Sequence, residues 1–242
     1  MLYSNQRHFA QIYWSATLLN KIIIAAAILI LAPLTSLADL SGELSLGGKS
    51  KYVYNGYEVR DNPLGEANAY VEHDSGFYLN GWFALNDVID FEEIDGTVGK
   101  IIEIDEGTSL DLSVSWFNIP DMNNTTGDAI VAAARIDHDF MDMSGFVGVE
   151  YWKIIDDSAS NGFIFHGGVS KDFSLDTVTL TPSIRAGYDT TYEEEVWFGE
   201  LSLAPSIALG DTTLTFLETT YTMREREDSH WVVGMSISTP IF

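Results

Sequence analysis

Apolar and polar residues alternate with a period of two along most of the chain after residue 39. In the clearest segment, 109–116, every even position is apolar, while the odd positions are serine or Asp111. Successive side chains of a β-strand point to opposite faces, so this pattern predicts strands with one apolar and one polar face. The segment 178–188 repeats it, and no segment shows convincing helical periodicity. The region is therefore predicted to be all-β.

Turn residues divide the alternating region into twelve predicted strands. Most are close to the length of about 9–11 residues with which a tilted strand crosses a bilayer. The connections fall into two sets that alternate along the chain. One set is short, and the other is mostly longer and more polar, as in barrels with short periplasmic turns and long external loops. The prediction is an antiparallel up-and-down transmembrane β-barrel of about twelve strands, at 40–55, 65–73, 77–86, 97–104, 109–118, 129–138, 145–154, 162–170, 178–188, 197–209, 213–221 and 230–241.

Aromatic residues gather near the ends of these strands, as in the interfacial girdles of membrane barrels. The long-loop level holds Tyr54, Tyr57, Trp116, Tyr151, Tyr188, Trp197, Tyr221 and Trp231, and the short-turn level holds Phe77, Phe140, Phe146, Phe173 and Phe242. A β-sandwich also has aromatic residues along its strands, with its apolar face turned inward, and periodicity alone does not separate the two folds. Pro182 and Pro205 each remove a ladder donor within a predicted strand and predict local bulges.

The first 38 residues have the layout of an export signal. Lys21 precedes an apolar run over 22–32, Pro33 ends the run, and Ser36-Leu37-Ala38 resembles a small-x-small cleavage site. The apolar run would span only about 16 Å as a helix, against a hydrocarbon core of about 30 Å, which argues against a retained anchor. The predicted organisation is a cleaved signal peptide at 1–38 and a barrel at 39–242.

Charge and composition narrow the partners. The chain has 12 basic and 36 acidic residues, a formal net charge of −24, and phosphate repulsion argues against nucleic acid as a partner. It has no cysteine, which excludes disulfides and a lipid anchor on cysteine. The mean hydropathy of +0.05 is too low for a bundle of membrane helices.

One stretch of the chain resembles a known family. It comprises Ser50-Lys51-Tyr52-Val53-Tyr54-Asn55-Gly56, then Asn62-Pro63, then His73-Asp74-Ser75-Gly76-Phe77-Tyr78 and Trp82. Over about 48–86 these residues resemble the TorF-like porin family, uncharacterised outer-membrane barrels of proteobacteria. That family usually has arginine where this chain has Asn55. The resemblance implies a small porin-like barrel in the outer membrane and supplies no substrate.

Catalytic and metal-binding motifs are not evident in the sequence. None of the five histidines has a second histidine or a cysteine at metal-ligand spacing, so neither a metal nor a cofactor is predicted. Barrel lipid hydrolases need only a few residues, and His166 facing Ser170 or Ser183 is one such arrangement. A lumen or interface histidine is the simpler interpretation.

Acidic clusters lie in the predicted long loops. Hard cations prefer oxygen ligands, so Mg²⁺ or Ca²⁺ bridging to lipopolysaccharide phosphates is one interpretation, and solvated, mutually repelling loops are the other. None of the clusters matches the spaced calcium-loop motif. The clusters are Asp90-Glu92-Glu93-Asp95, Asp156-Asp157, Glu193-Glu194-Glu195 and Glu225-Glu227-Asp228.

If the apolar strand faces point to lipid, the charged strand residues point into the lumen. Arg or Lys on the lipid face would cost about 2–4 kcal/mol at the bilayer midplane. The charges predicted to line a pore are Glu43, Lys49, Lys51, Asp111, Arg135, Asp137, Glu150, Arg185 and Glu200. They are hypothesised to line an aqueous pore whose acidic excess favours cations, or alternatively to pair across the lumen and close it.

The resulting functional hypothesis is a porin-like, non-enzymatic protein in the outer membrane of a Gram-negative bacterium. It would let small hydrophilic solutes diffuse passively through an acidic lumen, with outer-membrane lipid and lipopolysaccharide around it. The alternatives are an outer-membrane lipid-modifying hydrolase and a closed structural or adhesive barrel.

Overall fold

The computed structural model describes residues 40–85, 91–118, 128–155, 158–191 and 195–241. The predicted signal peptide at 1–38 and the terminal Phe242 lie outside these described residues. Within them, no helix has the length and apolar character needed to cross a bilayer.

Twelve long antiparallel strands form one sheet in the described part of the chain. They are β1 (Leu40–Lys49), β4 (Leu64–His73), β5 (Phe77–Leu85), β6 (Phe91–Asp105), β7 (Thr108–Asn118), β8 (Ala129–Phe140), β9 (Met143–Ile154), β10 (Gly162–Ser170), β12 (Val178–Asp189), β13 (Val196–Leu209), β14 (Thr212–Arg224) and β15 (His230–Pro240). Three further strands are short, namely β2 (Tyr52–Tyr54), β3 (Tyr57–Arg60) and β11 (Phe173–Leu175), and a 3₁₀ helix spans Ser158–Ser160.

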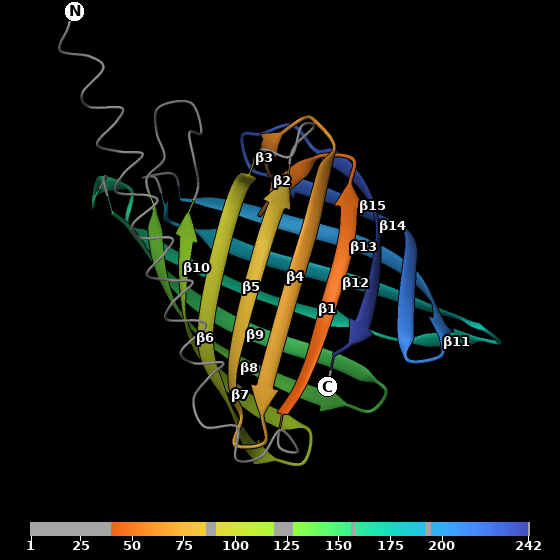
Figure 1. The fold of residues 1–242 in the computed structure, drawn as a ribbon. Helices are drawn as coiled ribbons and strands as arrows, with labels where there is room; N and C mark the ends of the chain where they lie inside the picture. Colours follow the sequence, from red (N-terminus) through yellow and green to blue (C-terminus); the bar gives the residue numbers. More distant parts are fainter. Residues whose placement is uncertain (1–39, 86–90, 119–127, 156–157, 192–194, 242) are drawn as a thin grey trace, which may run out of the picture. The chain divides into compact units, whose positions relative to one another are not determined.

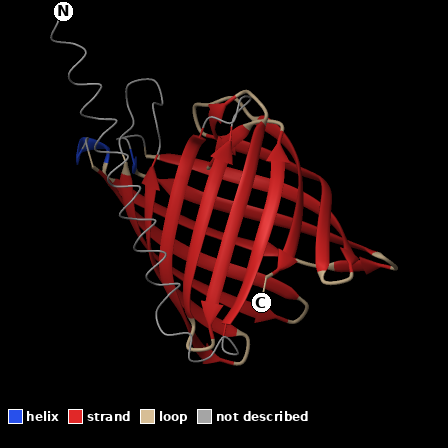
Figure 2. Ribbon diagram, viewed as in Figure 1, coloured by secondary structure: helices blue, strands red, loops and turns tan. Residues whose placement is uncertain are grey.

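The sheet closes on itself. Each long strand pairs with its neighbours in the chain, β10 also pairs with β12, and the first strand β1 pairs with the last strand β15 (Figure 1). Figure 2 shows the strands inclined to one another around a single ring. The predicted antiparallel up-and-down barrel of twelve strands is therefore confirmed. Two boundaries differ by six residues from the prediction: β6 begins at Phe91 rather than at residue 97, and β1 ends at Lys49 rather than at residue 55.

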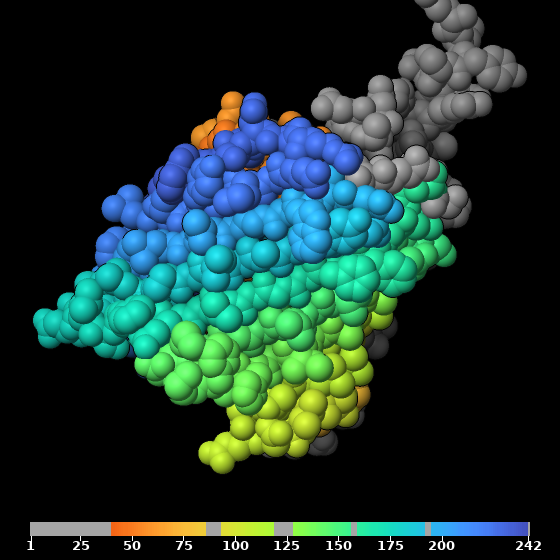
Figure 3. Space-filling view, turned by 180° about the vertical axis from the view of Figure 1, so that it is seen from behind, coloured from red at the N-terminus to blue at the C-terminus, as the bar shows by residue number. Residues whose placement is uncertain are grey.

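The outer surface of the barrel is apolar. Leu112, Val114 and Ile184, which would lie in the core of a sandwich, have exposed fractions of 43%, 48% and 50%. In Figure 3, chain segments coloured from green to blue lie as neighbouring inclined bands along the back of the molecule. A wide, exposed surface of aliphatic side chains on a closed sheet suits a hydrocarbon environment and not water. The sandwich alternative is excluded.

Aromatic pairs on the outer face lie towards the long-loop end of the strands. The ring centroids of Tyr188 and Trp197 are 4.9 Å apart, and so are those of Tyr221 and Trp231. Three of the aromatic residues predicted for the girdles lie elsewhere. Tyr54 and Tyr57 belong to the short strands β2 and β3, and Phe146 faces the charged interior, where Arg135 covers its ring.

The two strand prolines have different effects. At Pro205 the β13–β14 register shifts between Leu203 and Ser206, which confirms the bulge predicted there. At Pro182 the β12–β13 register is continuous, so the bulge predicted at this position is wrong. Pro182 instead lies where β12 changes partner, because pairing with β10 ends at Ser183 and pairing with β11 starts at Leu180.

The first predicted strand, 40–55, is shorter than expected. β1 ends at Lys49, and the chain then forms the separate hairpin β2–β3 over residues 52–60. A single strand over 40–55 would place Tyr52 and Tyr54 on the apolar face of Leu44 and Leu46, and the structure shows that this placement is wrong. The turn before Tyr52 breaks the alternation, so the face of these tyrosines is set by the hairpin and not by β1.

We expect Val114→Arg to destabilise the barrel by about 2–4 kcal/mol, because Val114 lies in the middle of β7 on the outer face. Unfolding by urea in lipid vesicles measures this change. The control is Met141→Arg in the β8–β9 turn, where the native side chain is 92% exposed and the added charge reaches water. Equal effects of the two substitutions would show that the middle of β7 does not lie in lipid.

Candidate functional site

The β2–β3 hairpin turns at Asn55-Gly56. Both residues have positive φ, 48° and 78°, as a two-residue hairpin turn of type I′ requires. Asparagine and glycine tolerate this conformation better than other residues, so the dipeptide itself directs the chain to reverse here. Asn55 is only 1% exposed, which shows that the tip of the hairpin is packed against the barrel and does not extend into solvent.

The hairpin contacts three separate parts of the barrel wall. The ring of Tyr52 lies 5.9 Å from that of Trp82 on β5, and the ring of Tyr54 lies 5.7 Å from that of Trp152 on β9. At the tip, Arg224 of β14 donates a hydrogen bond of 3.1 Å to the carbonyl oxygen of Asn55.

These three contacts place the hairpin across the interior. In the closed ring of twelve strands, β5, β9 and β14 are each separated by four positions, so they stand a third of the circumference apart. A segment that contacts all three lies inside the ring near its axis. The hairpin therefore narrows the lumen at its long-loop end, where β2 and β3 are seen in Figure 1.

An apolar cluster fills the same end of the interior. Tyr54 and Phe117 pack against its buried members, which are Ala129, Val131, Trp152, Ile154, Ile164 and Phe198. These residues alternate with exposed neighbours such as Ile130 on their own strands, so they point inward. The hairpin thus docks on apolar surface as well as through hydrogen bonds, and the cluster supports the hairpin from the β7–β13 side.

A buried ion pair underlies the hairpin tip. Arg224 contacts Asp189 at 3.0 Å, and their side chains are only 4% and 6% exposed. The backbone N–H of Thr191 donates a hydrogen bond to Asp189 as well. Charges so far from water need close partners, and removing one partner of such a pair is strongly destabilising. Because Arg224 also holds Asn55, the pair ties the hairpin to β12 and β14.

The base of the hairpin has its own ion pairs. Lys51 Nζ lies 2.6 Å from Glu58 and 2.7 Å from Asp61, and His230 contacts Glu58 at 3.0 Å. The hydrogen bond from Lys51 lowers the pKa of Asp61, and the same bond raises the pKa of Lys51. Because the folded pKa of Asp61 is depressed, this attraction is present at neutral pH and is lost as the carboxylate is protonated in acid.

A chain of polar contacts lies beneath the apolar cluster. Glu200 contacts Arg185 at 3.2 Å, and Arg185 lies 3.1 Å from His166 Nδ1. Since a guanidinium only donates, His166 Nδ1 accepts, which places the imidazole proton on Nε2, 3.4 Å from Glu150. Trp152 also donates to Glu150, at 2.8 Å. Both ring nitrogens of His166 therefore face Arg185 and Glu150, and not Ser170 or Ser183 as the hydrolase hypothesis required.

The pore-lining residues predicted from sequence occupy several places. Glu43 and Asp111 line a cavity of about 600 Å³, and Arg135, Asp137, Arg185 and Glu200 line a second cavity of about 330 Å³. Glu150 belongs to the chain of contacts beneath the apolar cluster. Lys49 contacts Glu66 at 3.1 Å. Lys51 does not lie on β1, because that strand ends at Lys49.

The acidic residues predicted for the long loops differ in burial and in the element to which they belong. Glu93 and Asp95 belong to β6, and Glu93 is 4% exposed and accepts a hydrogen bond of 2.7 Å from Tyr52, so neither is a solvated loop residue. Glu195, Glu225, Glu227 and Asp228 are exposed. Of the other acidic residues in these clusters, Glu92 is described by its backbone alone, and the rest lie outside the described residues. Among described residues, no group of three or more His, Cys, Asp or Glu could hold a metal ion.

These features define a class of architecture: a closed antiparallel barrel with an apolar outer surface, charged interior strands and a hairpin folded inward. Solved porins share its barrel fold. The KdgM porin, solved in complex with disordered oligogalacturonate, is 8% identical with a TM-score of 0.57, covering 81% of this chain and 98% of KdgM. The NanC porin is 12% identical with a TM-score of 0.56, covering 81% of this chain and 98% of NanC.

At these identities the likeness shows the fold alone. No family model matches the chain, and no curated protein matches it. The chain thus has a porin-like fold, while the resemblance to the TorF-like family stays a prediction.

We expect Gly56→Ala to release the hairpin from the barrel interior. A Cβ at Gly56 would lie 2.7 Å from the Met223 carbonyl oxygen and 2.8 Å from Arg224 Cβ, and positive φ adds strain of about 1–3 kcal/mol. Amide hydrogen exchange over residues 52–60 should accelerate about tenfold or more.

Gly210→Ala is the matched control. Gly210 also has positive φ, but nothing lies within 4 Å of an added Cβ. Exchange over 52–60 should be unchanged in this variant. Unchanged exchange in Gly56→Ala would show that the hairpin is not held by the contacts described.

Proposed function

We propose that the protein is a passive diffusion channel of the Gram-negative outer membrane for small hydrophilic solutes, with a preference for cations. The observation that carries the proposal is the hollow, polar half of the closed barrel. Cavities of about 600 and 330 Å³ adjoin opposite groups of strands, and six of the nine charged residues predicted to line a pore border one or the other of them. A barrel with an apolar outside and a charged inside has the construction that a water-filled passage through lipid needs.

The balance of charge on the inward strand faces supports the cation preference. The β-sheet register places Glu66 and Glu72 on the same face as Asn68 and Tyr70, which border the larger cavity. Together with Glu43, Asp111, Asp137 and Glu200 these carboxylates outnumber the basic groups of that interior, Lys49, Arg135 and Arg185. Fixed negative charge in a narrow passage attracts cations and repels anions.

The inward-folded hairpin supports selection by size. It lies across the long-loop end of the lumen, and the apolar cluster beside it leaves less room than a twelve-strand ring alone would. Solutes that pass between the hairpin and the charged wall would therefore be small. The resemblance to TorF-like porins and the export signal predicted at 1–38 agree with an outer-membrane location, where lipid and lipopolysaccharide would cover the apolar band.

The charge of the proposed passage does not suit the solute with which KdgM was solved. KdgM was solved with oligogalacturonate, which is a polyanion. An acidic passage would disfavour such a solute, so we propose the passive channel function without that substrate. The structural, closed-barrel alternative predicts an interior with no conducting path.

Purified protein in a planar bilayer should give discrete conductance steps, and the reversal potential in a KCl gradient should show that K⁺ permeates better than Cl⁻. Cation preference is expected because acidic groups dominate the inward faces. The empty bilayer and a heat-unfolded sample are the controls. Absence of conductance steps from folded protein would overturn the channel and favour the closed barrel.

The ion pair of Arg135 and Asp137 offers a paired test of the lumen charge. Arg135 donates to Asp137 Oδ1 at 2.5 Å, and both residues line the smaller cavity. Arg135→Gln should increase the preference for K⁺, and Asp137→Asn should decrease it, as measured by reversal potential. Shifts of the same sign in both variants would show that the pair acts through structure and not through its charge on the passage.

A further inference from the structure

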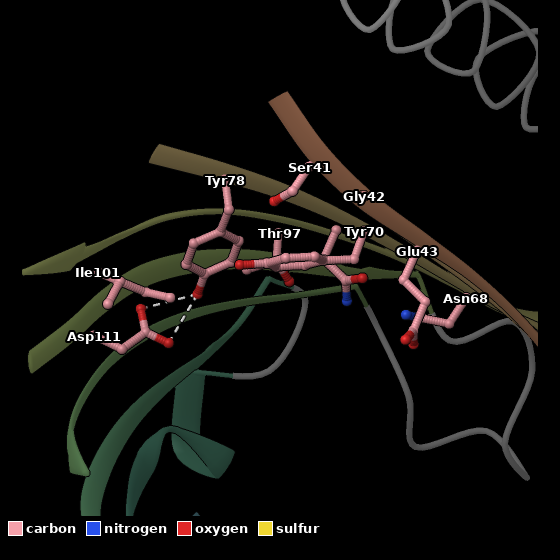
Figure 4. A pocket seen from close by; sticks show the side chains of 10 residues that line it. Ser41, Gly42, Glu43, Asn68, Tyr70, Tyr78, Thr97, Ile101 and Asp111 are labelled. Carbon is pink, nitrogen blue, oxygen red and sulfur yellow. Dashed lines mark hydrogen bonds between the residues drawn. The ribbon is translucent and has the colours of Figure 1, made fainter. Parts of the chain in front are cut away.

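The larger cavity lies in one wall of the lumen, formed by β1, β4, β5, β6 and β7. Its volume is about 600 Å³, which is within the range of small-molecule sites. Figure 4 shows Asp111 at one end of the lining group and Glu43 towards the other, with the side chains of Tyr70 and Tyr78 between them. The cavity therefore presents two separated carboxylates along an aromatic surface.

No basic side chain lines this cavity among the described residues. Two cations stand on strand positions beside the cavity. Lys100 on β6 turns away, with Nζ 4.5 Å from the ring centroid of Phe77, and Arg135 faces Asp111 in the β7–β8 register. Its guanidinium, however, is bound to Asp137 Oδ1 by two hydrogen bonds, of 2.5 and 3.0 Å, and lies 4.0 Å from the ring centroid of Phe146. Arg135 thus belongs to the smaller cavity, and the larger one carries an excess of negative charge.

The hydrogen-bonding groups of the cavity are rich in acceptors. Tyr78 donates its hydroxyl proton to the carboxylate of Asp111, at 2.9 and 3.0 Å from the two oxygens. Tyr70 donates its own to Glu72 at 2.7 Å. Both hydroxyl oxygens are then left only as acceptors. Asn80, which also lines the cavity, has a buried Oδ1 with no hydrogen-bond partner.

The two tyrosine rings supply a surface for an alkyl cation. Their centroids are 5.4 Å apart, with an angle of 36° between the ring planes. The face of an aromatic ring attracts cations, and its carbon surface packs against methylene groups. A ligand that fits must bring positive charge, N–H donors and a short apolar stem.

We propose that this cavity is a binding site for primary alkylammonium ions, with Glu43 and Asp111 as the carboxylates that attract them. An ammonium group would donate its N–H protons to a carboxylate, Asp111 or Glu43, and the methylene chain would lie along Tyr70 and Tyr78. The proposal deepens the proposed function, because it rests on solutes reaching the lumen and names the class of cation that the passage retains.

Isothermal titration calorimetry on the folded, detergent-purified protein tests the site directly. The probes are 1,4-diaminobutane, butylammonium, tetramethylammonium and K⁺ at equal ionic strength. We expect butylammonium to bind at least about tenfold more tightly than tetramethylammonium, which has the same single charge but no N–H donor, and 1,4-diaminobutane, with its second charge, to bind more tightly still. Binding of butylammonium no tighter than that of tetramethylammonium or K⁺ would overturn the site.

Variants then locate the binding. Asp111→Asn and Glu43→Gln should each weaken 1,4-diaminobutane about tenfold, because each loses one charged acceptor. The matched control is Glu218→Gln, which removes an acidic group from β14 outside the residues that line this cavity. Unfolded migration on an unheated gel would identify a variant that fails to fold, and the comparison of probes on the unaltered protein needs no variant.

Conductance is measured independently of amine binding, so the channel and the binding site can each be rejected without rejecting the other. Conductance steps without preferential amine binding would leave the channel and remove this site. Amine binding without conductance would leave the site and remove the channel. Where both hold, 1,4-diaminobutane should interrupt the K⁺ current of the unaltered protein at concentrations near its dissociation constant, and Asp111→Asn should shift those concentrations upward about tenfold.

Discussion

Pairing of every strand edge is the constraint on which this structure depends. Hydrocarbon offers no hydrogen-bond partner to a backbone N–H or C=O, so a sheet in a membrane must close. Here the closure is made by β1 with β15 and by β10 with β12. Once the ring is complete, the two faces of every strand have different surroundings. The period-two pattern then places apolar side chains outside and charged side chains inside.

The closed ring also limits how the interior can be shaped. A long strand cannot enter the lumen without losing its partners, so only the connections are free to do so. The Asn55-Gly56 turn uses this freedom, because its positive φ values reverse the chain within two residues and bring Tyr52 and Tyr54 inward. The Arg224–Asp189 ion pair and the apolar cluster then hold the hairpin across the ring.

The two sides of the barrel interior differ in how their charged side chains are paired. On one side Arg135 and Arg185 are each paired with a carboxylate and each covered by an aromatic ring, so their charges are locally balanced. On the other side, the carboxylates of Glu43 and Asp111 face a cavity that no cation lines within the described part of the chain. This asymmetry is the basis for proposing both a preference for cations and a particular site that retains them.

The sequence by itself determined the twelve long strands, because alternation is a local property that each segment carries independently of its partners. It also located the bulge at Pro205, although the same missing N–H at Pro182 leaves the β12–β13 register continuous, because the effect depends on which neighbour the residue faces. Only the tertiary structure decided that Tyr52 and Tyr54 turn inward, although Asn55-Gly56 was a readable turn signal, and that Arg224 and Asp189 pair under the hairpin. Those contacts join residues far apart in the chain, and closure of the ring alone brings them together.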